Sequence, residues 1–257
     1  MTDTPRQTPS RRQFLAGAAV ATGAAATGKL VHAQAAGPDP KITELQPWMQ
    51  YLGDGVDAKP YGFPSKHEAN VVRRTVPWLT ADAVSSINFT PLHELEGIIT
   101  PNGLCFERHH SGVADIPWAD HRLMINGLVD NPMVFTMDDL MRFPRENRTY
   151  FLECAANTGM EWRGAQLNGV QFTHGMIHNV VYTGVPLRLL LQEAGVRTTG
   201  TWLLAEGADA SGMTRSIPME KALDDCLVAT HMNGERLRAE QGYPVRLVVP
   251  GWEGNMW

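Results

Sequence analysis

R-T-Y-F-L-E-C-A-A-N-T-G-M-E-W-R-G, residues 148–164, is the stretch of sequence that decides the fold. Its apolar run Tyr-Phe-Leu, residues 150–152, predicts a strand that delivers Cys154 to a turn. The small residues 155–159 leave room for a large group to approach the sulfur. A single Cys at a strand end is more often an inert buried thiol than a ligand or nucleophile, because a buried thiol without a basic neighbour stays protonated. The rest of the sequence must decide between these roles.

Short β-prone runs separated by turn signals recur through the rest of the chain. Asn-Gly pairs follow two of them, and such pairs favour the tight turns of β-hairpins. The runs predict strands over residues 121–126, 133–135, 202–205, 226–232 and 245–249.

Two short helices are predicted between these strands. Thr136 and Asp139 have the spacing of a capping box, which predicts that a helix begins there. A leucine-rich helix is expected over residues 184–195, with Pro186 in its first turn and Gly195 just past its end. No Gly-x-Gly-x-x-Gly follows a strand, so a dinucleotide-binding fold is not expected. We predict an α+β fold with mixed β-sheets and short helices.

Composition limits the class of protein. With 257 residues, 43% of them hydrophobic, the chain can bury the core of one large domain. Its cysteines, Cys105, Cys154 and Cys226, are odd in number and widely spaced, so they offer neither a disulfide framework nor a zinc ribbon. No Cys-x-x-Cys-His motif occurs, so the chain carries no c-type haem of its own. For Cys105 and Cys226 we expect packing roles.

The N-terminus has the three regions of an export signal. Ser10-Arg-Arg-Gln-Phe-Leu15 contains a twin arginine, residues 16–28 form an Ala/Gly-rich apolar run, and Ala33 and Ala35 offer cleavage sites. The apolar run is too short to span a membrane. A disordered tail with a chance arginine pair is the alternative. We expect a twin-arginine signal peptide over residues 1–35 and a periplasmic location, with a cofactor inserted before export.

The net charge of the chain favours some classes of binding partner over others. Residues 1–35 hold four of the 22 basic residues and one of the 27 acidic residues, so the remainder has 18 basic against 26 acidic residues and a net charge of −8. This balance disfavours nucleic acid and anionic membranes as partners and suits a protein with a Lys-rich rim, although simple solubility explains it equally well. Residues 36–88 are rich in Pro, Gly and charge without sustained periodicity, which predicts an N-terminal arm.

Several segments concentrate groups that bind anions or metals. Phe106-Glu-Arg-His-His110 is expected in a loop, where it suits an anionic ligand, with a solvated basic loop as the equal alternative. Asp209 lies in a small-residue loop, a geometry common to cofactor contacts and plain turns. Arg246 interrupts an apolar strand, so its charge is either paired or holds an anionic ligand. His174 and His178 could share a metal on a helix, although ordinary packing is the stronger expectation.

Sequence motifs cover nearly all of the chain after the N-terminal signal in one consistent order. They are Ile99-Thr-Pro-Asn102, Phe106-Glu-Arg-His-His110, Leu152-Glu-Cys-Ala-Ala-Asn157, residues 202–209, Ser216-Ile-Pro218, Met232-Asn-Gly-Glu235 and Gly242-Tyr-Pro-Val-Arg-Leu-Val-Val-Pro-Gly251. In content and order they resemble the molybdopterin domain of the sulfite oxidase family. Within that family, residues 108–112, 160–175 and 251–257 look most like the sulfane dehydrogenases of the thiosulfate-oxidising Sox system.

The resemblance implies a set of site residues. Cys154 would be the protein thiolate on molybdenum, a soft ligand for a metal already held by a dithiolene. Arg108 would border the catalytic pocket. The molybdenum–molybdopterin cofactor would be held by Phe106, Glu107, Arg108, His109, His110, Cys154, Asp209 and Arg246.

The resemblance also implies the reaction and the domain organisation. The substrate would be a sulfane sulfur on a carrier-protein cysteine, and electrons would leave singly to a c-type cytochrome subunit, with the protein supplying placement and charge. The molybdopterin-binding domain would cover residues 89–257 and be incomplete at its C-terminal end. A β-sandwich dimerisation domain would be absent, so we expect a fragment of a protein that is an oligomer at full length.

Three positions depart from the family pattern. Gln241 stands where the family has a pterin-contacting His, and Met213 stands where it has an active-site Tyr. The usual pocket Trp falls near Tyr182. Because Met213 offers no hydroxyl donor, the sequence favours carrier-bound sulfane over free sulfite as the substrate.

Other functions remain as alternatives at this stage. A sulfite:cytochrome c dehydrogenase would use the same chemistry on free sulfite. The methionine-sulfoxide reductase branch of the fold would run the reaction in the opposite direction with a membrane quinol partner. A cofactor-free scaffold or binding subunit is the alternative that is not an enzyme.

Overall fold

The computed structural model describes residues 46–56, 58–59, 61–76, 82–164 and 168–257. The chain divides into two compact units, residues 1–62 and residues 63–257. The described part of the first unit contains the 3-10 turn η2 (Pro47–Met49), and its side chains are exposed. The signal peptide expected over residues 1–35 lies outside the described residues, so it stays a prediction.

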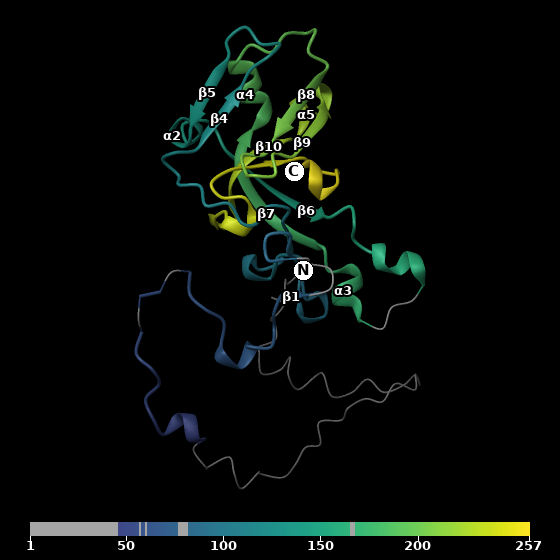
Figure 1. Ribbon diagram of the computed structural model, residues 1–257. Coiled ribbons are helices and arrows are strands. Elements are labelled where there is room, and N and C mark those ends of the chain that lie inside the picture. The colour runs from purple at the N-terminus through teal and green to yellow at the C-terminus, as the bar shows by residue number, and fades with distance from the viewer. Residues whose placement is uncertain (1–45, 57, 60, 77–81, 165–167) are drawn as a thin grey trace, which may run out of the picture. The chain divides into compact units, whose positions relative to one another are not determined.

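A five-stranded sheet forms the centre of the second unit (Figure 1). Its strand order is β11-β10-β7-β6, and β12 also pairs with β10. All of these pairings are antiparallel. The strands are β6 (Glu146–Glu153), β7 (Ile177–Pro186), β10 (Leu227–Met232), β11 (Glu235–Arg236) and β12 (Arg246–Val248).

The core forms around β7. Its residues His178, Val180 and Tyr182 are buried and alternate with partly exposed residues, as expected for a strand with one face toward the core. Gly184 lies so close to β10 that a Cβ there would meet the carbonyl oxygen of Val228 at 2.5 Å. Glycine at this position therefore allows the two strands to pair.

Two hairpins and their helices pack at one end of the sheet (Figure 1). The predicted capping box is confirmed, since the Thr136 hydroxyl accepts from the N–H of Asp139 and the Asp139 carboxylate accepts from the N–H of Thr136. The leucine-rich helix is also present, with Pro186 at its N-cap rather than in its first turn. The elements are β4 (Arg122–Ile125), β5 (Met133–Thr136), α2 (Met137–Leu140), α4 (Leu187–Glu193), β8 (Trp202–Glu206), β9 (Thr214–Pro218) and α5 (Met219–Asp224).

A separate three-stranded sheet contains residues that were expected from the sequence to be irregular. It has the order β1-β2-β3, with β1 at Arg74–Thr75, β2 at Ile87–Phe89 and β3 at Glu107–Arg108. The expected loop over residues 106–110 was therefore wrong in part, because β3 pairs with β2 within it. Strands β1 and β2 also lie largely within the segment expected to be an arm, and the division between the two units falls at residue 62.

Short helical elements connect these sheets. Their shortness agrees with the predicted α+β fold with mixed sheets and short helices. They are η3 (Lys66–Glu68), η5 (Leu92–Glu94), η6 (Asn102–Leu104), η7 (Gly159–Arg163), α3 (Val170–His174), η8 (Ala239–Gln241) and η9 (Gly254–Met256).

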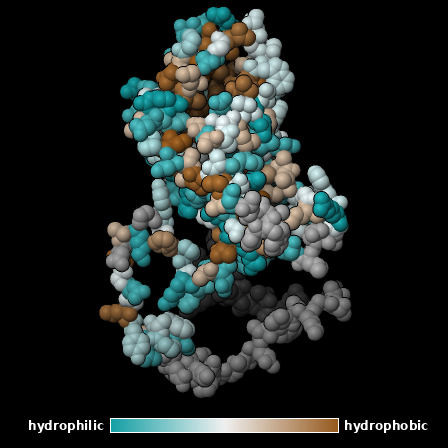
Figure 2. All heavy atoms as spheres, viewed as in Figure 1, coloured by the Kyte–Doolittle hydropathy of each residue, from teal (hydrophilic) through white to brown (hydrophobic). Residues whose placement is uncertain are grey.

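Some apolar side chains remain exposed on the hairpins. Met124, Val134, Trp202 and Leu204 are each more than half exposed, and apolar residues gather at that end of the unit in Figure 2. Among the described residues, no helix is long and apolar enough to cross a bilayer.

Candidate active site

Cys154 lies at the end of β6 as a partly exposed free thiol. Its N–H donates to the carbonyl of Met176 at 3.0 Å, and its carbonyl accepts from the N–H of Asn157 at 2.9 Å. The predicted strand and turn around the sulfur are thus both present. The side chain packs against a buried apolar cluster, which Trp257 also contacts; the cluster consists of Val76, Ile87, Phe89, Phe106, Leu152 and Met176.

Asn157 fixes the turn that follows the thiol. Its side-chain oxygen accepts from the N–H of Met176 at 3.1 Å, and its amide nitrogen donates to Glu153 Oε1 at 2.9 Å. A Cβ on Gly254 would lie 3.0 Å from the carbonyl oxygen of Glu153, so the C-terminal segment passes close to the end of β6. Both contacts restrict where the sulfur can point.

Gln241 joins Phe106 to Arg246. Its buried amide nitrogen donates to the carbonyl of Phe106 at 2.9 Å, and Arg246 Nη1 donates to the Gln241 backbone carbonyl at 3.2 Å. The ring of Phe106 lies 4.9 Å from the ring of His178. The position where the family pattern has a His is therefore occupied by a residue that connects two of the predicted cofactor contacts.

No described residue balances the positive charge of Arg246. Its Nε is buried without a hydrogen-bond partner, and no carboxylate in the described part of the chain forms an ion pair with it. Burial raises the pKa of Cys105 and of Tyr182 to about 12 and lowers the pKa of His178 to about 3. These three neighbours are therefore uncharged at neutral pH. Of the two roles that the sequence allowed for Arg246, the structure fits the binding of an anionic group better.

Glu107 forms a hydrogen bond with His109 and an ion pair with Arg73. The His109 ring nitrogen Nε2 lies 2.6 Å from Glu107 Oε2, and Arg73 Nη1 lies 2.9 Å from Glu107 Oε1. Burial alone would raise the pKa of Glu107, but hydrogen bonds from His109 and Asn88 and the charge of Arg73 lower it. Glu107 is therefore a carboxylate at neutral pH that balances the charge of Arg73.

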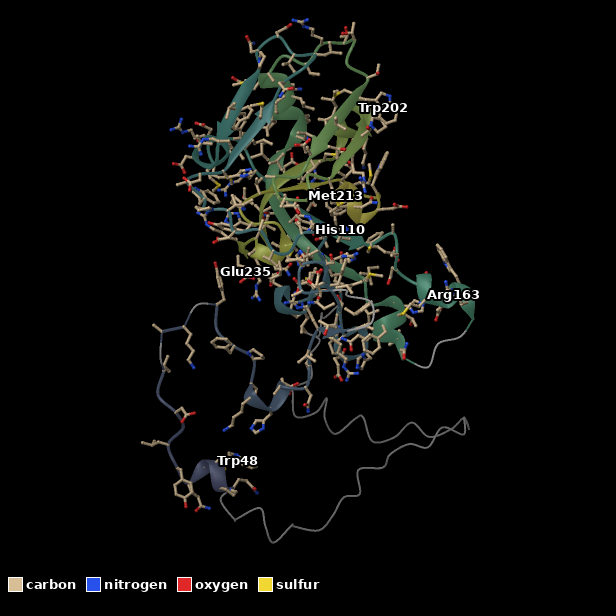
Figure 3. All side chains as sticks on the ribbon, in the orientation of Figure 1. Trp48, His110, Arg163, Trp202, Met213 and Glu235 are labelled. Carbon is tan, nitrogen blue, oxygen red and sulfur yellow. The ribbon has the colours of Figure 1, made fainter. Side chains whose placement is uncertain are left out.

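The segment around His110 contacts the loop of Asp209, although the two are far apart in sequence. Ser111 Oγ donates to Asp209 Oδ2 at 3.0 Å, and the N–H of Ser211 donates to Ser111 Oγ at 3.1 Å. Burial, followed by the charges of Arg108 and Arg215, lowers the pKa of His110. Met213 follows the loop that contains Asp209, and its carbonyl accepts from the N–H of Gly207 at 3.0 Å; Figure 3 labels both His110 and Met213. The Tyr-to-Met departure therefore lies at the end of the loop that holds Asp209.

Arg108 and His110 are the exposed members of the predicted set. The Arg108 guanidinium donates to the carbonyl of His109 and, at 3.5 Å, to the carbonyl of Ser85. No carboxylate in the described ranges forms an ion pair with it. A guanidinium that is held by carbonyls alone keeps its charge available to an anionic ligand.

Together these residues fit a large anionic cofactor. Phe106 belongs to the apolar cluster that Cys154 contacts, and through Gln241 it reaches Arg246. The unpaired Nε of Arg246 supplies a buried donor, while the partly exposed thiol supplies a soft metal ligand. Within the described ranges no three His, Cys, Asp or Glu side chains are placed to hold a metal ion by themselves.

The two-histidine metal hypothesis is not supported. His174 is the last residue of α3 and His178 lies in β7, so they do not share a helix face. Sequence reasoning also missed His178, Tyr182 and Cys105 as neighbours of Arg246. The two-residue period of a strand could have placed His178 on the same face as Val180 and Tyr182.

The pKa of His178 makes the stability of this region dependent on pH. Its folded-state pKa lies below the unfolded value of 6.5, so its contribution is present above pH 6.5 and is lost as the pH falls toward about 3. Relative to His178→Gln, the wild-type protein should lose up to about 1.4 kcal/mol of unfolding free energy per pH unit below 6.5. Urea denaturation at several pH values measures this difference.

His93→Gln is the matched control, because the ring of His93 is nearly half exposed. Its stability curve should run parallel to that of the wild type. If the His178→Gln curve also runs parallel, the ring takes up protons in the folded state and the interior beside Arg246 is open to water.

Comparisons with known proteins agree with this geometry. The family model for the oxidoreductase molybdopterin binding domain matches residues 110–257. The crystal structure of the sulfane dehydrogenase SoxCD from Paracoccus pantotrophus superposes with a TM-score of 0.82 and 63% identity, covering 86% of this chain and 57% of that one.

More distant relatives are NADH nitrate reductases. The Volvox carteri protein is 32% identical over 84% of this chain, and the Solanum lycopersicum protein is 37% identical over 64% of it. The chain spans 27% and 20% of the lengths of these two relatives. The family match covers more than half of the chain and confirms both the expected fold and the expected cofactor class. The chain therefore belongs to the oxidoreductase molybdopterin binding domain family, as its resemblance to the sulfite oxidase family predicted.

Proposed function

We propose that the protein is a molybdenum oxidoreductase that oxidises carrier-protein-bound sulfane sulfur and passes the electrons to a c-type cytochrome subunit. The 63% identity to a sulfane dehydrogenase over 86% of the chain is the observation that carries this proposal. The nitrate reductases are far less similar, at 32% and 37% identity. The free thiol of Cys154 and the unbalanced charge of Arg246 support it independently of similarity.

In this proposal the chain's own residues bind and orient the cofactor. Cys154 ligates molybdenum through its thiolate, and Arg246 binds an anionic part of the cofactor with its unpaired Nε. Phe106, through its backbone bond to Gln241, keeps the apolar cluster and Arg246 in fixed relation. The cofactor, when bound, supplies the two-electron chemistry on sulfur.

Two side chains near this site, one exposed and one partly buried, select the substrate. Arg108 offers a positive charge with no carboxylate partner among the described residues, which suits an anionic sulfur at the tip of a flexible arm. Met213, at the end of the loop that holds Asp209, adds no hydroxyl donor. A thioether there suits a polarisable sulfane better than a small, strongly hydrated oxyanion such as sulfite.

Association with the two protein partners is favoured by the charge of the chain. Residues 36–257 carry a net charge of −8, which would steer a partner with a positive rim toward them. Both the cytochrome and the sulfur carrier are proposed as separate polypeptides. The full-length protein is proposed to be an oligomer.

The decisive experiment compares the full-length protein with its Cys154→Ser variant. Wild-type protein loaded with cofactor in the cytoplasm should hold about one molybdenum per chain and reduce cytochrome c with a thiosulfonated carrier protein as substrate. The variant should lose that turnover, because serine is a harder and less acidic donor. Molybdenum and pterin analysis together with cytochrome reduction measures both.

Cys226→Ser is the matched control, because Cys226 is buried in a different apolar cluster, where its thiol donates to the carbonyl of Lys221. It should keep both molybdenum and turnover. Fast turnover on free sulfite would favour the sulfite:cytochrome c dehydrogenase instead, and reduction of methionine sulfoxide would favour the reductase branch. A wild-type protein without molybdenum would support the scaffold alternative and contradict the role given to Cys154.

The proposed location is the periplasm, and the proposed route is export by the twin-arginine pathway. Replacing Arg11 and Arg12 together by lysine should leave the precursor in the cytoplasm, because this pathway reads the arginine pair. Cell fractionation with an antibody against the protein measures the distribution. The single change Arg6→Lys, outside the pair, is the control and should leave export unchanged. Normal export of the double variant would contradict the proposed pathway.

A further inference from the structure

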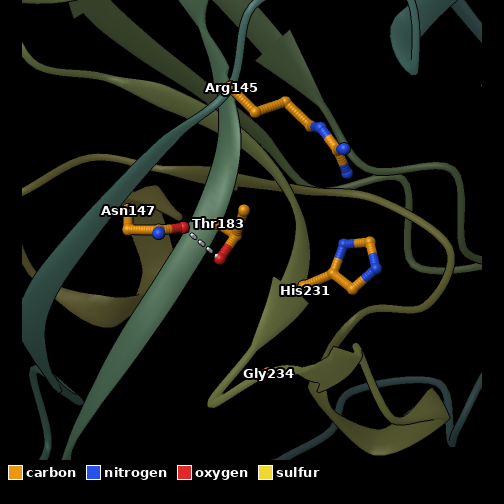
Figure 4. Close-up of a pocket in the computed structure, with 5 residues that line it drawn as sticks. All are labelled: Arg145, Asn147, Thr183, His231 and Gly234. Atoms are coloured by element: carbon orange, nitrogen blue, oxygen red, sulfur yellow. Dashed lines mark hydrogen bonds between the residues drawn. The ribbon is translucent and has the colours of Figure 1, made fainter.

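A polar pocket lies at the opposite end of β6 from Cys154. It has a volume of about 380 Å³ and is lined by Arg145, Asn147, Thr183, His231 and Gly234 (Figure 4). Asn147 is near the start of β6, whereas the thiol follows its last residue, so they are separated by roughly 20 Å at about 3.3 Å per residue. The pocket is therefore distinct from the cofactor site.

The register of the central sheet builds this pocket. Asn147 on β6 lies opposite Thr183 on β7, and Thr183 lies opposite His231 on β10. The next strand continues the row, because His231 lies opposite Arg236 on β11. Neighbouring residues in such a row have side chains on the same face of the sheet. Four polar side chains from four strands thus form one continuous line.

Positive charge dominates the pocket. Burial, followed by the charges of Arg236 and Arg145, lowers the pKa of His231, and no carboxylate is among the groups that act on it. The guanidinium of Arg145 has no ion-pair partner among the described residues, and its single hydrogen bond is a weak one to Met141 Sδ at 3.9 Å. The nearby carboxylate of Glu146 is already bonded to Arg148 and Arg188.

Hydrogen-bond donors in the pocket remain free. Asn147 Oδ1 accepts from the Thr183 hydroxyl at 2.7 Å, which leaves the amide nitrogen of Asn147 available. His231 Nδ1 lies 2.9 Å from Thr230 Oγ1, which leaves Nε2 available. Figure 4 shows the Arg145 guanidinium and the His231 ring on the same side of the pocket. Free donors and unbalanced positive charge are the two requirements for binding an oxyanion.

We propose that this pocket binds a tetrahedral oxyanion, sulfate or phosphate, between the Arg145 guanidinium, the Asn147 amide and the His231 ring. Arg145 forms the charge-assisted contacts, and the other two side chains orient the remaining oxygens. The pocket is larger than a free oxyanion and lies in the range of small-molecule sites, so the group can also belong to a phosphate monoester.

Nuclear magnetic resonance of the ring protons of His231 in the full chain tests the proposal, with His231→Gln used to assign the signals. Sodium sulfate and sodium phosphate are titrated against sodium chloride at matched ionic strength. We expect saturable shifts with the two oxyanions and a raised pKa of His231, because a bound anion favours the protonated ring. Arg145→Gln should weaken binding by about tenfold or more.

Two control variants separate this pocket from other sites. Arg142→Gln removes a mostly exposed arginine that pairs with Asp139 outside the pocket, and it should leave the affinity unchanged. Arg108→Gln alters the proposed substrate site and should also leave the His231 shifts unchanged. Tighter binding of phenyl phosphate than of phosphate would identify an ester as the ligand, and equal binding would identify the free ion. Shifts that fail to saturate, or that persist in Arg145→Gln, would overturn the proposal.

Discussion

The antiparallel pairing of β6 with β7 is the constraint on which both proposed sites depend. The register runs without interruption from Glu146 opposite Gly184 to Glu153 opposite Ile177. A slip of one residue would turn every side chain of β6 to the other face of the sheet. The intact register delivers Cys154 to its turn at one end and places Asn147 beside Thr183 at the other. One strand thus positions the proposed metal ligand and the proposed oxyanion pocket.

Positive charge without an ion-pair partner among the described residues is the second feature that both proposed sites share. Some charged groups of the described residues are neutralised within the chain, as Arg73 is by Glu107 and Arg238 is by Glu235. Arg246 differs, because its neighbours are a thiol, a phenol and an imidazole that burial keeps neutral. Keeping a partly buried guanidinium without a counter-charge costs stability, so a ligand that supplies the negative charge would offset this cost.

Local sequence signals predicted local structure well. The run of residues 150–152, the capping box at Thr136 and the leucine-rich helix each depend on neighbours within a few residues, so their patterns are visible in the sequence. Contacts between distant segments were harder to foresee. Strand β3 exists only because β2, from far upstream, pairs with it.

The site shows the same division between local and distant effects. The order of the motifs predicted Cys154, Arg108 and Arg246 as site residues. It did not predict which groups surround Arg246 or whether they are charged. The neutrality of the groups around Arg246 follows from burial by elements far apart in sequence. Likewise, the four-residue spacing of His174 and His178 suited a helix, whereas β7 begins between them. Tertiary contacts, not local propensity, decide such cases.

The claim that Cys154 is the protein ligand of molybdenum can be tested most directly by X-ray absorption at the molybdenum edge. The full-length wild-type protein and its Cys154→Ser variant, both loaded with cofactor, would be compared. The variant should show one sulfur fewer around molybdenum and a lighter scatterer in its place, because a thiolate has been removed. An unchanged sulfur shell in the variant would contradict the claim and leave Cys154 as an ordinary packed thiol.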